Sequence, residues 1–239
     1  MTGPTITGAQ RFTDDRGDAD PQLRDALQAY TRGQASQRRV LTALGSARLL
    51  VPVVTTSEGS SATATDPTQH GDSGHGSSVA VPILVGNDGR RGMLAFTCVD
   101  SMRQWRPGAR PVPVSVGEAC QAACDEGADA LVLDMAGPVP YTVEGYFLSV
   151  LAEQGTVPEP KSDTRVLAAI YRVTHTEFGI ERVRVLDSER ADIGVRLELE
   201  HRDDDSIRRV ADRLAEELRP MLPGGVELSA VVRATRPED

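Results

Sequence analysis

The sequence predicts an α+β fold divided into two small domains. Short β-rich runs and apolar residues at helical spacing occur in both halves of the chain, without a strict strand-helix alternation. The segment Pro158-Glu159-Pro160 has no apolar periodicity and separates the two halves. A length of 239 residues allows one large domain or two small ones. We therefore expect a mixed sheet with helices in the first domain and helix-strand-strand-helix-strand in the second.

Composition narrows the classes of partner and the compartment. The formal net charge is −9, so the chain has no general attraction to phosphate backbones or anionic lipid. Its three cysteines, Cys98, Cys120 and Cys124, are an odd number, unlike a secreted disulfide scaffold. Residues 1–20 have no signal-peptide pattern, and no apolar run reaches the ~20 residues that span a bilayer. We expect a cytoplasmic protein that binds neither nucleic acid nor membrane.

Polar segments set the expected domain bounds. Residues 1–20 are rich in Gly, Thr and Asp, and residues 55–78 are rich in Ser, Thr, Gly, Ala and Asp without periodicity, which predicts disorder in both. A loop as long as the second is unusual inside a compact domain, so it is either an insertion or a mobile lid. In chain order we expect a disordered N-terminus at 1–20, a first domain at 21–155 with the disordered loop at 55–78, a linker at 156–162 and a second domain at 163–235.

Local signals predict the elements of the first domain. Asp20-Pro21 can cap and open a helix, and Ser115 and Glu118 have capping-box spacing. Asn87-Asp88-Gly89 separates two apolar runs and predicts a β-hairpin. The nearly continuous apolar run at 130–135 indicates a strand buried on both faces. The expected elements are helices at 21–33 and 37–47, a strand at 48–54, hairpin strands at 79–85 and 91–98, a helical turn at 101–105, a proline-bearing edge strand at 110–114, a helix at 115–127, strands at 130–135 and 141–144 and a helix at 145–153.

The second domain has a clearer pattern. Ile193, Val195, Leu197 and Leu199 alternate with polar residues and Gly, which predicts a half-buried strand. The expected order is a helix at 163–178, hairpin strands at 180–187 and 192–201, a helix at 206–219 and a strand at 226–232. Three strands with both helices on one face are the simplest way to bury these apolar stripes.

Four segments, in this order, resemble the SseB family, which is named for an enhanced serine sensitivity phenotype. They are Ala47-Arg48-Leu49-Leu50-Val51-Pro52-Val53, Gly92-Met93-Leu94-Ala95-Phe96-Thr97, Trp105-Arg106-Pro107-Gly108-Ala109-Arg110-Pro111-Val112-Pro113-Val114 and Glu126-Gly127-Ala128-Asp129-Ala130-Leu131-Val132-Leu133-Asp134. The resemblance is to the amino-terminal domain in its actinobacterial form, over roughly residues 23–152, and the C-terminal third is similar to the smaller domain that often follows. It implies an α+β cytosolic protein with no established activity and no catalytic residues to carry over.

The remaining candidates, which are possible metal ligands, are better explained by ordinary structural roles. Cys120 and Cys124 lie four residues apart on one predicted helix face, but a structural zinc site needs four ligands, so core packing is favoured. His70 and His75 lie in the polar loop near carboxylates and could hold a divalent metal, but ordering the loop would cost entropy, so a solvated loop is favoured. We expect no catalytic residues, no metal and no cofactor.

The strongest candidate for binding surrounds Trp105, the only tryptophan. Aromatic and arginine side chains are the types most often found as interface anchors, and arginine can also hold an anionic ligand through paired hydrogen bonds. The alternative is a tryptophan at the edge of the core with solvated arginines around it. If Trp105 is an anchor, Trp105→Ala should leave the fold intact and remove binding. The candidate binding residues are Arg48, Arg91, Arg103, Trp105, Arg106 and Arg110.

These observations favour a cytosolic, non-enzymatic accessory protein that binds an unknown protein partner. The alternative is a small-molecule sensor or regulatory protein that binds an amino acid. It rests on the family name and on a fold-level likeness of the C-terminal part to regulatory ferredoxin-like modules. An enzyme would need a cleft with perturbed titratable groups, which a sequence cannot show. The oligomeric state and the role of the 55–78 loop stay open.

Overall fold

A computed structural model describes residues 12–56 and 78–233. Contacts divide the chain into an N-terminal unit, Met1–Ala35 with Arg39–Thr156, and a C-terminal unit, Ser36–Arg38 with Val157–Asp239. The expected disorder of residues 1–11 and 57–77 falls outside the described residues. The predicted α+β class is confirmed, because helices and mixed sheets occur in both units.

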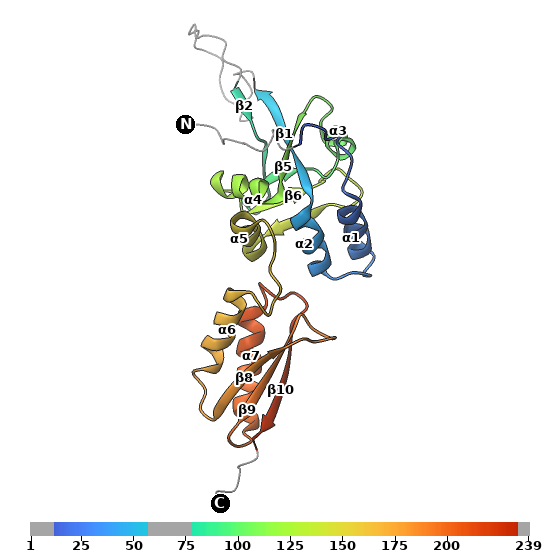
Figure 1. The fold of residues 1–239 in the computed structure, drawn as a ribbon. Coiled ribbons are helices and arrows are strands. Elements are labelled where there is room, and N and C mark those ends of the chain that lie inside the picture. The colour runs from blue at the N-terminus through green and yellow to red at the C-terminus, as the bar shows by residue number, and fades with distance from the viewer. Residues whose placement is uncertain (1–11, 57–77, 234–239) are drawn as a thin grey trace, which may run out of the picture. The chain divides into compact units, whose positions relative to one another are not determined.

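The N-terminal unit is built on two sheets (Figure 1). One has the strand order β2-β1-β5 and the other β3-β4-β6-β7, and a bridge between Leu50 and Phe96 joins them. The elements are α1 (Pro21–Thr31), α2 (Gln37–Ser46), β1 (Arg48–Thr56), β2 (Ser78–Ala80), β3 (Ile83–Val85), β4 (Arg91–Ala95), α3 (Val99–Trp105), β5 (Arg110–Ser115), α4 (Val116–Asp125), β6 (Ala130–Leu133), β7 (Tyr141–Glu144) and α5 (Gly145–Gln154).

The strand expected at 79–85 is two strands in different sheets, which corrects that prediction. Ala80 lies opposite Val54 of β1, whereas Ile83 lies opposite Met93 of β4. Pro82 lies between them and has no backbone N–H for a continuous ladder. The proline-bearing strand β5 lies at a sheet edge as predicted, and the predicted capping box opens α4, where Ser115 Oγ accepts from the Glu118 N–H at 3.3 Å.

Two parallel strands form the centre of the four-stranded sheet. Gly92 of β4 lies opposite Ala130 of β6, so the carboxyl ends of both strands meet at one edge. β6 ends two residues before the predicted bound, because Asp134 adopts a positive φ of 48° that a strand cannot continue through. Side chains that follow the two strands are therefore brought together at this edge.

Residues 12–20 are ordered against the N-terminal unit, which corrects the expected disorder of that stretch. The Val99 N–H donates to Gly17 O at 2.8 Å, and Gly17 adopts a φ of 81°. A Cβ at Gly17 would lie 2.4 Å from Val99 Cγ2, so only glycine allows this close approach. Asp20 then caps α1 as predicted, accepting from the Leu23 N–H at 3.0 Å.

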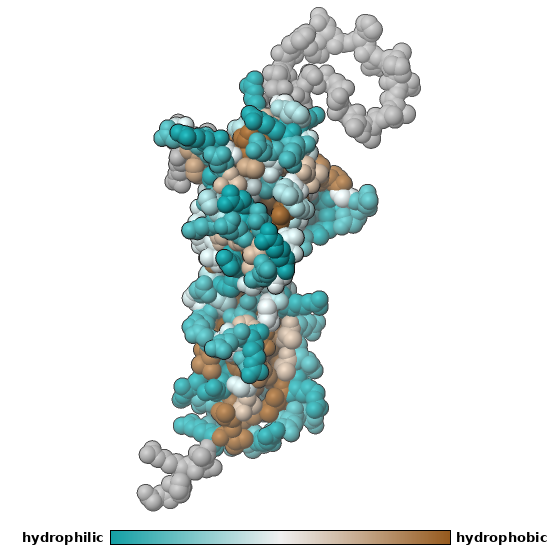
Figure 2. All heavy atoms as spheres, turned by 90° about the vertical axis from the view of Figure 1, so that its right-hand side faces the viewer, coloured by the Kyte–Doolittle hydropathy of each residue, from teal (hydrophilic) through white to brown (hydrophobic). Residues whose placement is uncertain are grey.

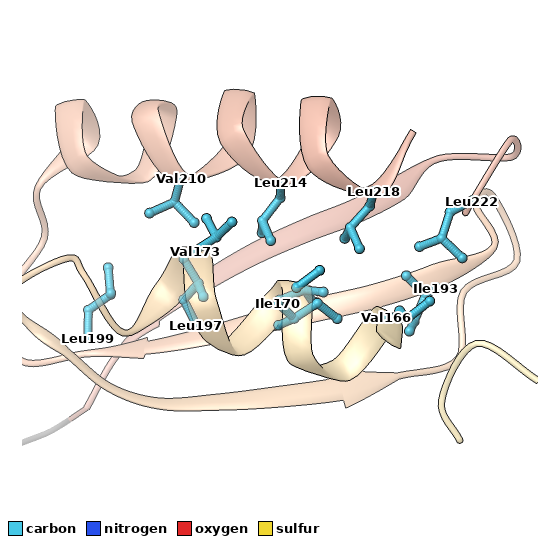
Figure 3. Close-up of a cluster of buried hydrophobic side chains, with 12 residues drawn as sticks. Val166, Ile170, Val173, Ile193, Leu197, Leu199, Val210, Leu214, Leu218 and Leu222 are labelled. Carbon is cyan, nitrogen blue, oxygen red and sulfur yellow. The ribbon is translucent and has the colours of Figure 1, made fainter. Parts of the chain in front are cut away.

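The C-terminal unit has the predicted helix-strand-strand-helix-strand order. Its sheet has the order β10-β9-β8, with β8 antiparallel and β10 parallel to β9. Alternate β9 residues and both helices contribute to one core, which Figure 3 shows between the helices and the sheet. The first helix ends earlier and the second begins earlier than predicted. The elements are α6 (Thr164–Thr174), β8 (Ile180–Leu186), β9 (Ile193–Leu199), α7 (Asp204–Leu218) and β10 (Val226–Val232).

Candidate functional site

A polar network lies at the carboxyl ends of β4 and β6. Arg48, the first residue of β1, donates through Nη1 to Thr97 O at 2.5 Å and through Nη2 to Asp15 Oδ1 at 2.9 Å. Its guanidinium also donates to the other oxygen of Asp15 and to Asp18 O. The side chains of Arg48 and Asp15 are 12 % and 13 % exposed and form a bidentate pair.

Asp134 extends the network from β6. Its carboxylate accepts from the Thr97 N–H at 2.9 Å and from Thr97 Oγ1 at 2.6 Å, and it also accepts from the Ser101 hydroxyl of α3. Its own N–H donates to Ala95 O at 3.1 Å. Asp15, Arg48, Thr97, Ser101 and Asp134 thus form one connected set, which we term the Thr97 network.

Electrostatics differ between the two carboxylates of the Thr97 network. Burial raises the pKa of Asp134, and the hydrogen bonds from Thr97 and Ser101 oppose this without cancelling it. The hydrogen bonds from Arg48 lower the pKa of Asp15. Asp134 is 5 % exposed and already accepts from three donor groups. These facts favour a role in holding the two strand ends together over a role in proton transfer.

The Thr97 network positions α3. Cys98 caps this helix, with Sγ accepting from the Ser101 N–H at 3.4 Å, and Ser101 is bound to Asp134. The helix ends at Trp105, whose ring lies 5.6 Å from that of Phe96. The Arg106 guanidinium lies 5.8 Å from the centroid of the Trp105 ring, within cation–π range.

Three exposed arginines lie close to Trp105 in the sequence. Arg103 lies in the last turn of α3, Arg106 follows the helix, and Arg110 begins β5 after a turn in which the Ala109 N–H donates to Arg106 O at 3.1 Å. None of the three forms an ion pair with a residue in the described ranges 12–56 and 78–233. We term Arg103, Trp105, Arg106 and Arg110 the α3 face.

The structure separates Arg48 and Arg91 from the α3 face, although both were predicted to belong with it. Arg48 turns inward to the Thr97 network. Arg91 begins β4, and its N–H donates to Asp129 Oδ2 at 2.8 Å. Because a strand rises about 3.3 Å per residue, β4 holds Arg91 at the opposite end from α3.

The packing of Trp105 argues against the expectation that Trp105→Ala leaves the fold intact, which stays untested. Trp105 is half-buried and packs against the cluster that contains Leu50, Leu94, Phe96 and Met102. Truncation to alanine would therefore remove core contacts as well as an exposed ring edge. The arginines are the cleaner residues to vary.

Sequence reasoning missed Thr97, Ser101 and Asp134 as site residues. A signal was present, because Thr97 and Asp134 are each the first polar residue after an apolar run. That signal is informative only if the two runs are parallel neighbours, since parallel strands bring their carboxyl ends together. The sequence indicated a hairpin for the first run and did not indicate its parallel pairing with β6.

The cysteines and possible metal ligands lie apart from this site. Cys120 is a core residue as predicted, and burial raises the pKa of its thiol to about 12. Cys124 is exposed, which corrects the prediction that both pack in the core. In the described part of the chain no three His, Cys, Asp or Glu residues are grouped to hold a metal ion, and no helix is long and apolar enough to cross a bilayer. His70 and His75 lie outside the described residues.

Comparison with known proteins identifies the family. The family described as "SseB protein N-terminal domain" matches residues 23–149, which extend from α1 into α5 and include the Thr97 network from Arg48 onward and the whole α3 face. No curated protein and no solved structure matches the chain. The matched segment covers more than half of the 239 residues and has the order of elements described above. The chain belongs to the SseB family.

Proposed function

We propose that this chain is a non-enzymatic accessory protein of the cytosol that binds another protein through the α3 face. The observation that carries the proposal is a half-buried tryptophan with Arg106 over its ring and two further exposed arginines, Arg103 and Arg110, close by in sequence, all three without an ion partner among the described residues. Tryptophan and arginine are the residue types that most often dominate binding energy at protein interfaces. The Thr97 network holds α3, so the α3 face is presented on a rigid element.

The charge of the α3 face favours an acidic partner. The chain as a whole carries −9, yet this surface carries three guanidinium groups within eight residues of sequence. Guanidinium groups form paired hydrogen bonds with carboxylates, which give both affinity and orientation. Local positive charge on an acidic protein also directs the approach of an acidic partner and disfavours approach elsewhere.

The non-enzymatic part of the proposal rests on the use of the polar groups. Within the Thr97 network the buried carboxylate of Asp134 is occupied by Thr97 and Ser101. Arg48 is likewise occupied by Asp15 and two backbone carbonyls. Groups saturated in this way favour a structural role over acid–base chemistry, which needs a group within reach of a substrate.

Reversing charge on the α3 face tests the proposal. Arg103→Glu/Arg106→Glu should lower recovery of the partner at least tenfold when the tagged full-length chain is captured from its own cytosol and quantified by mass spectrometry. Arg24→Glu/Arg32→Glu is the matched control, because it makes the same change of charge at exposed positions on α1 and at its end. Both variants should keep the wild-type melting temperature within a few degrees. Equal recovery with both variants would contradict the proposal.

A groove in the C-terminal unit favours small-molecule sensing as a second candidate function. It lies between α6 and β8 and has a volume of about 420 Å³. Its lining combines apolar residues with Tyr171, Thr174, His175, Glu181 and Arg182. Pockets of roughly 300–1,000 Å³ are typical of small-ligand sites. Tyr171 is 64 % exposed and stacks on His175 with ring centroids 4.9 Å apart.

Thermal melting tests the sensing candidate. An amino acid present at 100 times its dissociation constant would stabilise the protein by about 2.7 kcal/mol and raise the melting temperature. Tyr171→Ala should abolish that rise while changing the ligand-free melting temperature little, because the ring is mostly exposed. A flat response across the amino acids at millimolar concentration, or an equal rise in Tyr171→Ala, would remove the groove as the sensing site.

A further inference from the structure

The outer edge of β10 is open. β10 pairs in parallel with β9 over Val226–Val232 without a bulge, and no other strand in the described residues pairs with its outer edge. Proteins usually protect such edges with lysine, proline, a bulge or a short strand. β10 is seven residues long and contains neither lysine nor proline.

The second half of β10 is also exposed on the side that should be covered. Ala230 and Val232 lie opposite Leu197 and Leu199, whose side chains are buried in the core. Yet every residue of β10 from Ser229 onward is exposed, with Val231 at 44 % and Val232 at 50 %. Figure 2, viewed from the side on which β10 lies in Figure 1, shows apolar surface at the lower end of this unit.

We propose that β10 pairs antiparallel with β10 of a second copy of this chain. The two three-stranded sheets would then form one six-stranded sheet about a two-fold axis, with the helices of both copies on the same face. Such an isologous contact uses one surface twice and closes, so it yields a dimer and no larger assembly. This inference is independent of the α3 face, which lies in the other unit.

The two-fold axis restricts the register of this pairing. Residues directly opposite each other in a sheet point to the same face. A two-fold axis perpendicular to the sheet must therefore place one residue opposite its own copy. It cannot place a residue opposite the copy of its chain neighbour. An axis at Ala230 places Leu228 opposite Val232 and Ser229 opposite Val231. An axis at Ser229 or at Leu228 places Glu227 opposite an uncharged residue.

Charge complementarity selects the axis at Ala230. In that register Glu227 of each copy lies opposite Arg233 of the other, which gives two cross-strand pairs of opposite charge. Glu227 accepts from Ser188 Oγ at 2.7 Å and lies 3.9 Å from Arg190, and Arg233 lies 3.2 Å from Glu181. The Glu227 and Arg233 side chains remain 42 % and 61 % exposed, so both can take a further partner.

Cysteine scanning in the full-length chain tests the register. Paired Cα atoms of antiparallel strands lie about 4.5–5.5 Å apart, which is within disulfide range. Ala230→Cys should therefore form a disulfide-linked dimer in most of the protein on mild oxidation. Ser229→Cys is the matched control, because an exposed cysteine there would face Val231 and should link at least fivefold less. The unmodified chain, run in parallel, accounts for Cys98, Cys120 and Cys124.

Sedimentation tests the charge pairs without cysteine chemistry. The full chain should sediment as a dimer at micromolar concentration, and Glu227→Arg should raise the dissociation constant at least tenfold. Glu227→Arg/Arg233→Glu should recover most of that loss. A monomer at all concentrations up to about 100 µM would overturn the proposal. This holds also if β10 were found to pair with a strand of another protein. A dimer unaffected by Glu227→Arg and unlinked by Ala230→Cys would also overturn it.

Discussion

Asp134→Ala is expected to lower the free energy of unfolding of the N-terminal unit by about 3 kcal/mol. The change leaves the Thr97 N–H and the Thr97 and Ser101 hydroxyls without their acceptor in a buried setting. It also places alanine at a φ of 48°, which favours Asp, Asn and Gly. Urea titration of the full chain, followed by a signal from Trp105 in this unit, measures the loss.

Asp134→Asn is the control for that loss. Asparagine keeps an acceptor oxygen and tolerates the positive φ, so its unfolding free energy at pH 7 should stay within about 1 kcal/mol of the wild type. If alanine and asparagine gave equal losses, the acceptor would not be the group that matters. A loss below about 1 kcal/mol for alanine would argue against the Thr97 network as a structural tie.

The difference in stability between the wild type and Asp134→Asn should change with pH in a defined direction. Burial raises the pKa of Asp134 in the folded protein, so between its ordinary value of about 4 and the raised value the folded state binds more protons than the unfolded state. The contribution of Asp134 to stability therefore falls as the pH rises through that window. Asparagine does not titrate. The free energy of unfolding of Asp134→Asn should therefore increase relative to that of the wild type as the pH rises from 4 to 7, measured in parallel urea titrations.

Arg48→Ala is expected to cost about 2–3 kcal/mol and to release the segment that precedes α1. The change removes the donors to Thr97 O, Asp18 O and both oxygens of Asp15. Hydrogen exchange should report it locally, because the Val99 N–H is bonded to Gly17 O in that segment. Protection of the Val99 amide should fall by more than tenfold, whereas amides of the C-terminal core should keep wild-type protection.

Lysine at position 48 separates charge from geometry. Arg48→Lys keeps the positive charge but cannot form the paired hydrogen bonds with Asp15, so an intermediate loss is expected. Arg48 also lowers the pKa of Asp15, and this adds stability above the ordinary carboxyl pKa that is lost as the pH falls. Arg48→Ala should therefore show a weaker loss of stability with acid than the wild type. Unchanged protection of the Val99 amide in Arg48→Ala would contradict the expectation that Arg48 holds the segment that precedes α1.

Local features of the sequence determined much of the fold. Asp20 and Ser115 were predicted as helix caps from their spacing alone, and both cap helices. The alternation in β9 predicted which of its residues are buried, and it is confirmed in the C-terminal core. Such signals depend on neighbours within a few residues, so a single chain displays them directly.

Family membership and one part of the candidate site were also within reach of the sequence. Four segments in order indicated the SseB family, and Trp105 with its following arginines stood out by residue type alone. Arg103, Arg106 and Arg110 lie in the last turn of α3, directly after it and at the start of β5. Their grouping follows from proximity along the chain.

Only the tertiary structure decided which distant residues meet. Asp15 lies beside Arg48, and Thr97 lies beside Asp134, because β1, β4 and β6 are ordered and directed as they are. Pro82 divided an expected hairpin strand between two sheets, and the parallel pairing of β4 with β6 was not predicted. Strand order depends on the total burial of apolar surface and on the satisfaction of all backbone groups in the unit. Local periodicity shows which face of a strand is buried, but it does not specify which strand lies beside it.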